Sequence, residues 1–164
     1  ALFLPGSQEH LDLVGRLLPQ ANIDTSKIKI IGTGGMDYPN AGRDQRLVGA
    51  WFPAPDPAGW NEFSQKFAKT YGQAPPRIAA LAFDGVSLAT TLAGTPGAQP
   101  FAGASLTRPH GFTGVDGTFR LTSTGCERPL AILEVQKFGA SIIEPAGSAN
   151  SAPVAQEGPP RSVN

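Results

Sequence analysis

The strongest constraint on the fold of this chain is a strand, a helix and a second strand within its first 32 residues. Apolar runs predict strands at Leu2 to Leu4 and Ile28 to Ile31, and helical spacing predicts a helix from about Gln8 to Leu18 that Pro19 ends. Crossover connections of this kind are almost always right-handed, so the two strands should be parallel neighbours in an α/β fold. The predicted helix has Ser7 as its N-cap and an apolar stripe of Leu11, Val14, Leu17 and Leu18.

Glycine-rich loops follow both predicted strands. They are residues 5–7, with Gly6 and Ser7, and residues 32–37, with Gly35 and Asp37. Open α/β proteins bind ligands at the edge of the sheet where such loops emerge, and glycine lets the backbone approach a ligand closely. Two interpretations of Gly32–Asp37 stay open: a loose anion-binding cradle, or a tight turn after a strand.

The middle of the chain predicts a connector and two helices. Residues 47–52 predict a strand, and Pro53 to Pro55 a stiff connector. Asp56 caps the next helix, which Gly72 ends, and the simplest interpretation of its aromatic stripe is core packing. Residues 77–93 are apolar on nearly every side and predict a buried helix. The aromatic stripe consists of Trp60, Phe63, Phe67 and Tyr71.

The pattern changes to β at Phe112. A hairpin turn at Gly114–Gly117, a strand at Thr118 to Leu121 and further strands at Leu130 to Gln136 and Ser141 to Ile143 are predicted. Residues 147–164 hold almost no apolar anchor and predict a mobile tail.

Composition excludes several classes of function. The formal net charge is zero and only 16% of residues are charged, so the chain shows no electrostatic footprint for nucleic acid or an anionic membrane. The longest apolar run, Ile78 to Phe83, is far shorter than the roughly 20 residues of a membrane-spanning helix, so no membrane insertion is expected.

The residue types that carry catalysis are sparse. His10, His110 and Cys126 lie far apart, so neither a hydrolase triad nor a metal site is predicted, and no cofactor motif is complete. Asp84 lies in the apolar helix, where it either forms structural hydrogen bonds or contacts a ligand. The charged residues 43–46 are most simply a solvated loop, although ion pairs between lobes are an alternative.

One group of segments carries a family resemblance through its order along the chain: Leu2 to Gly6, Lys29 to Asp37, Gly49 to Pro55, Phe63 to Pro75, Ala79 to Val86, Gly111 to Arg120, Gly125 and Leu130 to Val135. In this order the segments resemble the type I periplasmic solute-binding proteins of the branched-chain amino-acid receptor group. Met36 and Phe83 depart from the family pattern, since many relatives carry Trp and Tyr there.

The resemblance implies a carboxyl-terminal portion of a two-lobed fold, in which helices flank parallel sheets and a β segment closes the chain. Residues 1–50 would belong to the second lobe, 51–121 to the first lobe, and 122–146 to the return into the second lobe, followed by the tail 147–164. The sequence opens on a strand without an initiator Met, so we expect it to continue upstream to a signal peptide and export to the bacterial periplasm.

The resemblance also implies function. The chain would bind a small polar solute, an amino acid or related carboxylate, without catalysis. The lobes would close around it by hinge motion, and the solute would be delivered to the permease of an ABC importer. Asp37 would pair with the ligand's ammonium, and Met36 would form an apolar wall. The alternative is a protein-binding regulator of the cell envelope, similar to activators of peptidoglycan synthases. The expected ligand-binding residues are Gly6, Ser7, Gly35, Met36, Asp37, Phe52 and Pro53.

Overall fold

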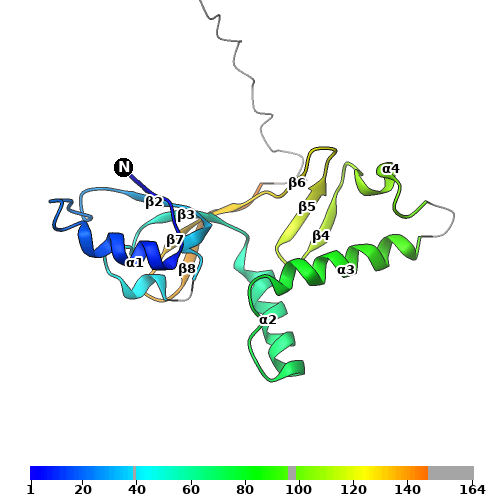
Figure 1. Cartoon of the computed structure of the whole chain (residues 1–164), viewed down its shortest axis with the longest axis horizontal. Helices are drawn as coiled ribbons and strands as arrows, with labels where there is room; N and C mark the ends of the chain where they lie inside the picture. The colour runs from blue at the N-terminus through cyan, green and yellow to red at the C-terminus, as the bar shows by residue number, and fades with distance from the viewer. Residues whose placement is uncertain (39, 96–98, 148–164) are drawn as a thin grey trace, which may run out of the picture.

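The computed structural model describes residues 1–38, 40–95 and 99–147. Residues 148–164 of the predicted tail therefore lie outside the described residues. The chain forms two parts, which two connections join (Figure 1). The sheet part consists of β1 (Leu2–Leu4), α1 (Gln8–Leu17), β2 (Ile30–Gly32), the 3-10 helices η1 (Gly34–Met36) and η2 (Ala41–Arg43), β3 (Trp51–Ala54), β7 (Ala131–Val135) and β8 (Ala140–Glu144). The helical part consists of α2 (Pro57–Tyr71), α3 (Ala79–Ala93), α4 (Gly103–Leu106), β4 (Phe112–Gly114), β5 (Gly117–Leu121) and β6 (Cys126–Glu127).

The sheet part contains a five-stranded sheet in the order β1-β2-β3-β7-β8. β1 and β2 are parallel neighbours, with Leu2 opposite Ile30 and Leu4 opposite Gly32, which confirms the predicted strand–helix–strand unit. β2 and β3 are also parallel, while β7 and β8 add two antiparallel strands at the far edge. The sequence prediction of an α/β fold with a closing β segment is therefore confirmed.

Helix α1 follows the prediction in its bounds and in most of its buried face. Leu11 and Leu18 are buried and Val14 is partly buried against the core, whereas Leu17 is 45% exposed. The inclusion of Leu17 in the buried stripe was wrong, since Leu18, the C-cap, occupies the core position at this end of the helix. Together with β1–β3 and β7, the helix closes a core of thirteen buried residues.

Residues 47–50 are not a strand, which corrects the prediction for residues 47–52. Leu47 and Ala50 are buried within turns, and Gly49 has a positive φ of 86°, so the chain reverses there before β3 begins at Trp51. Apolar residues in a buried loop give the same local pattern as a strand. Pro53 and Ala54, predicted as connector, belong to β3 and pair with Ile132 and Ala131.

Helix α2 begins and ends at the predicted residues. The Asp56 carboxylate accepts a hydrogen bond from the Ala58 N–H at 2.8 Å, Pro57 is the first helical residue, and Gly72 closes the helix with a φ of 74°. Trp60, Phe63 and Phe67 are only partly buried and Tyr71 is 65% exposed, so the aromatic stripe is not a closed core.

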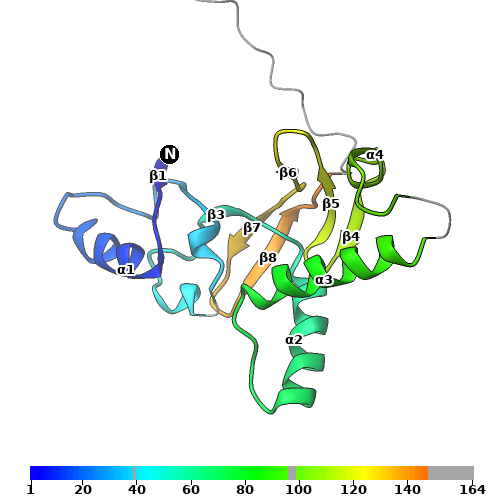
Figure 2. The same ribbon diagram turned by 45° about the vertical axis from the view of Figure 1, so that its right-hand side comes forward.

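Helix α3 is much less buried than its composition predicts. It buries Ala80, Asp84 and Leu92, while Leu81, Phe83 and Val86 are more than half exposed; Ile78, just before its first residue, is exposed as well. The prediction of a buried helix was wrong for this chain, because α3 packs through one face against β4 and, through Leu92, against Phe119 of β5 (Figure 2). Phe83 contacts Phe63 of α2 at its side.

The three-stranded sheet of the helical part is a hairpin with a short third strand, in the order β4-β5-β6. Gly114 and Gly117 face each other at the predicted turn. Phe112, Phe119 and Leu92 form a small second core. Residues 104–106, which carried no secondary-structure prediction, belong to the short helix α4.

The chain passes between the two parts twice, after β3 and before β7 (Figure 1). Because β3 pairs with β2 and β7, the first passage between the parts follows Ala54. The assignment of residues 1–50, 51–121 and 122–146 to the two lobes of a receptor stays a prediction.

Candidate functional site

The loops after β1 and β2 lie together at one rim of the sheet, as their topology predicts. At Gly35 an added Cβ would overlap the Gly6 carbonyl group, so the two loops are in direct backbone contact. Gly6 itself has a positive φ of 148°. Glycine at position 35 is therefore a requirement of loop packing.

Hydrogen bonds within the second loop favour the tight turn over the anion cradle. The Gly35 N–H donates to the Thr33 hydroxyl at 3.3 Å, the Met36 N–H to the Thr33 carbonyl and the Asp37 N–H to the Gly34 carbonyl, both at 3.0 Å. Since these three donors are used inside the loop, they are not available to an anion.

Ser7 does not face the other predicted site residues. Its hydroxyl lies 3.0 Å from Nδ1 of His10 on the exposed side of α1, and it makes no side-chain cap bond to the helix. Ser7, Gly6 and Gly35 are not part of the lining of the cavity between the two parts of the molecule.

A cavity of about 550 Å³ lies between the sheet part and the helical part. This volume falls within the usual range for small-molecule sites. Residues from both parts form its wall, so a ligand here would contact both. From the sheet part they are Met36, Asp37, Tyr38, Ala41, Phe52, Leu133, Val135, Phe138, Gly139 and Ala140, and from the helical side Pro57, Trp60, Asn61, Pro75 and Arg77.

Three of the seven predicted site residues line this cavity, and the other four, Gly6, Ser7, Gly35 and Pro53, lie outside its lining. Met36 and Phe52 are each 1% exposed and belong to the sheet core, so they form the floor of the cavity rather than a free wall. Asp37 retains 40% of its side-chain surface. Pro53 lines a separate hollow on the other face of the sheet, with Trp51 and Ile143.

Asp37 and Arg77 form the only ion pair that links the two parts across residues 1–38, 40–95 and 99–147. Oδ2 of Asp37 lies 3.9 Å from Nε of Arg77, which in turn donates from Nη1 to Oδ1 of Asp116 at 2.7 Å. Burial at the cavity raises the pKa of Asp37, Arg77 opposes this rise, and the negative charge of Asp116 adds to it.

The sequence prediction missed Arg77, Asp116 and Trp60 as members of this cluster. The Arg77 guanidinium carbon lies 4.5 Å from the centre of the Trp60 ring, a cation–π contact. The aromatic stripe did mark Trp60, but for core packing. Arg77 and Asp116 are 39 positions apart, so no local pattern could pair them.

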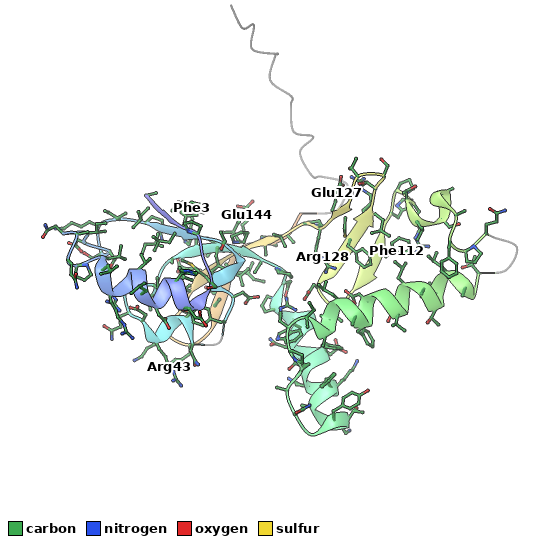
Figure 3. The ribbon with its side chains drawn as sticks, viewed as in Figure 1. Phe3, Arg43, Phe112, Glu127, Arg128 and Glu144 are labelled. Carbon is green, nitrogen blue, oxygen red and sulfur yellow. The ribbon has the colours of Figure 1, made fainter. Side chains whose placement is uncertain are left out.

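Asp84 has the structural role rather than a ligand contact. Its Oδ1 accepts a hydrogen bond from the Val115 N–H at 2.7 Å, and its Oδ2 lies 3.6 Å from Nη2 of Arg128. An added Cβ at Gly114 would overlap this carboxylate. Arg128 and Phe112 lie on the side of the helical part where β4 and β5 meet α3 (Figure 3). Asp84 thus ties α3 to the hairpin and to the segment that leads back to β7.

The charged loop at residues 43–46 forms its own ion pair. Arg46 donates to Oδ1 of Asp44 from its Nε at 2.7 Å and to Oδ2 from its Nη2 at 2.8 Å. Burial alone would raise the pKa of Asp44, but the hydrogen bonds and charge of Arg46 outweigh it and lower the pKa. The pair lies within the sheet part and does not connect the two parts.

The described residues show neither a metal-binding cluster nor a membrane-spanning helix. No three His, Cys, Asp or Glu side chains gather closely enough to hold a metal ion in the part of the chain that the structure describes. None of the helices in that same part has the length and apolar character to cross a membrane.

No protein-family model matches the chain, and no curated protein matches it. Solved structures do. A putative branched-chain amino acid ABC transporter from Rhodospirillum rubrum gives a TM-score of 0.71 at 20% identity, covering 87% of this chain and 44% of that chain. An isoleucine-bound branched-chain amino acid transporter substrate-binding protein from Streptococcus pneumoniae gives 0.56 at 18% identity, covering 87% and 44%. A benzoate-bound ABC transporter solute-binding protein from R. palustris gives 0.57 at 15% identity, covering 89% and 44%.

These likenesses define the class of fold. The chain adopts part of the type I periplasmic-binding-protein fold, the fold of branched-chain amino acid binding proteins and related extracellular receptors. It spans less than half the length of the solved chains that it matches, 42–44% for the first four.

Proposed function

We propose that this chain binds a small polar solute, an amino acid or a related carboxylate, without making or breaking a bond, and serves an ABC-type importer. The observation that carries the proposal is the cavity of about 550 Å³ whose wall comes from both parts of the molecule. The fold supports it, because solved proteins with this fold are described as binding leucine, isoleucine and benzoate.

The connections between the parts suit a binding protein. Two short segments, after Ala54 and after Glu127, join the parts, so a hinge motion would open or close the cavity without disturbing either sheet. A ligand that contacts both walls would favour the closed arrangement by its differential affinity. In this proposal the two parts act as lobes, the protein works in the periplasm, and the importer's permease is its partner.

A second candidate function is a protein-binding regulator of the cell envelope. It is favoured by α3, where Phe83 and Val86, on the same side of the helix, are each more than half exposed. Exposed apolar patches are typical of protein–protein contacts.

A thermal-shift screen separates the two candidates. Amino acids and small carboxylates are added to the chain, and a specific ligand should raise its melting temperature, since a ligand at 100 times its Kd adds about 2.7 kcal/mol to the free energy of unfolding. Asp37→Ala should abolish the shift for an ammonium-bearing ligand. The matched control, Glu9→Gln, changes an exposed carboxylate outside the cavity and should keep the shift. A flat response across the screen contradicts solute binding.

A further inference from the structure

We propose that Arg77 is a specificity-determining residue of the cavity, which binds the carboxylate of a zwitterionic amino-acid ligand while Asp37 receives its ammonium group. The inference rests on the proposed function and deepens it. What it adds is a residue on the helical side of the cavity that would bind the carboxylate of such a ligand.

The Arg77 guanidinium is fixed in place before any ligand binds. Asp116, which is 8% exposed, accepts a hydrogen bond from Nη1 at 2.7 Å, and the Trp60 ring supports the guanidinium at 4.5 Å. These contacts come from α2 and from the β4–β5 turn. A charged group that neighbouring groups already hold loses little conformational freedom when it binds a ligand.

Arg77 also keeps donors for a ligand. A guanidinium carries five N–H bonds in a planar fork that matches a carboxylate. Its hydrogen bond to Asp116 uses Nη1, and its Nε lies 3.9 Å from Asp37, which is beyond hydrogen-bond distance. The contact with Asp37 is therefore loose, and a ligand can replace it.

The charges of the cluster favour a ligand with two opposite charges. Asp116 is closely paired with Arg77, so among residues 1–38, 40–95 and 99–147 no cation lies closer to the Asp37 carboxylate than the loose contact at 3.9 Å. An ammonium group would balance Asp37, and a carboxylate would use the free donors of Arg77. A plain carboxylate would meet Asp37 unfavourably, and a plain amine would leave the donors of Arg77 unused.

The remaining wall suits an apolar side chain. Leu133, Val135 and Pro75 are buried in the lining of the cavity, and Phe138, which is 86% exposed, adds accessible apolar surface to it. Apolar side chains that bury against such a wall gain roughly 25 cal/mol per Å² of surface removed from water. Leucine is accordingly a suitable probe.

The experiment measures binding by calorimetry with three probes of the same carbon skeleton: L-leucine, its decarboxylated form isoamylamine, and its deaminated form isocaproate. For the unmodified chain we expect leucine to bind tightest and isocaproate weakest. Arg77→Gln should weaken leucine binding about tenfold or more, as expected for a lost charged hydrogen bond, and leave isoamylamine binding unchanged. Arg77→Lys, which keeps the charge without the fork, should recover only part of the loss.

The controls separate the possible failures. Arg16→Gln removes an exposed arginine of α1 outside the cavity and should leave all three affinities unchanged. Unchanged leucine affinity in Arg77→Gln, or equal affinity of the unmodified chain for leucine and isocaproate, overturns the role of Arg77 while the proposed function stands. The second result needs no variant, so it holds even if Arg77→Gln fails to fold. If the unmodified chain binds none of the three probes, both this inference and the proposed amino-acid function fail.

Discussion

Single glycine residues decide whether the two loops at the rim of the sheet can meet. Gly35→Ala would place a methyl group on the Gly6 carbonyl, whereas Gly85→Ala, in the open surface of α3, meets nothing within 4 Å. We expect Gly35→Ala to lower the free energy of unfolding by about 1–3 kcal/mol, as for overpacked sites. Gly85→Ala should raise it by roughly 0.5–1 kcal/mol through helix propensity.

Urea denaturation of both variants tests this comparison. The two substitutions add the same methyl group, but Gly85→Ala also gains helix propensity, so the contact between the loops is measured by the loss of stability in Gly35→Ala. Equal effects in the two variants would show that the loops can separate without cost, and that the rim of the sheet is not a fixed feature of the fold.

The ionisation of Asp37 should make the free energy of unfolding depend on pH. Its pKa in the folded chain is raised above 3.8, chiefly by burial. Between 3.8 and the raised value the folded chain binds more protons than the unfolded chain, so the free energy of unfolding falls as pH rises through this window. Above the window, Asp37→Asn should be more stable than the unmodified chain, and below 3.8 the two should converge. Denaturation curves from acidic to neutral pH measure this, and a constant difference across the range would contradict it.

At the scale of helices, the N-cap residues of α1 and α2 should contribute differently to the free energy of unfolding. The Asp56 carboxylate caps α2 through the Ala58 N–H, while the Ser7 hydroxyl contacts His10 and makes no cap bond to α1. We expect Asp56→Ala to cost about 1 kcal/mol of unfolding free energy, and Ser7→Ala clearly less. Thermal denaturation compares them, and an equal loss in both would show that the observed cap bond does not stabilise α2.

Local signals explain which elements the sequence could predict. The cap at Asp56, the break at Gly72 and the turn at Gly114–Gly117 each depend on a few adjacent residues, and the structure has them as predicted. The strand prediction for residues 47–50 was wrong because a buried turn and a buried strand have the same apolar sequence pattern. The prediction that α3 is buried was wrong because the burial of a helix depends on which elements pack against it. The sequence of the helix itself does not specify those elements.

In the candidate site, too, local features could be predicted from the sequence and contacts between distant residues could not. Topology predicts that the loops after β1 and β2 meet, and Gly6 and Gly35 do. The cluster of Asp37, Arg77 and Asp116 depends on contacts between the two parts, and no spacing in the sequence encodes it.

At the scale of the whole molecule, the two parts differ in how much apolar surface they bury. The sheet part has thirteen buried residues in one core, whereas the core of the helical part has three, Leu92, Phe112 and Phe119. The covered face of the sheet is the one that α1 packs on, and the opposite face leaves Phe3 and Ile31 exposed. Even with one open face, the sheet part therefore has much the larger core.

This difference predicts unequal local stability, because buried apolar contacts set the free energy of local opening. We expect the amide hydrogens of β2, β3 and β7 to exchange slowly and those of β4, β5 and α4 to exchange markedly faster, as measured by hydrogen–deuterium exchange. Phe119→Ala should accelerate exchange throughout the helical part and leave β2 and β3 unchanged, since Phe119 belongs to the smaller core. Uniform acceleration in both parts would show instead that they open as one cooperative unit, which would contradict the two-core description and count against the proposed hinge motion.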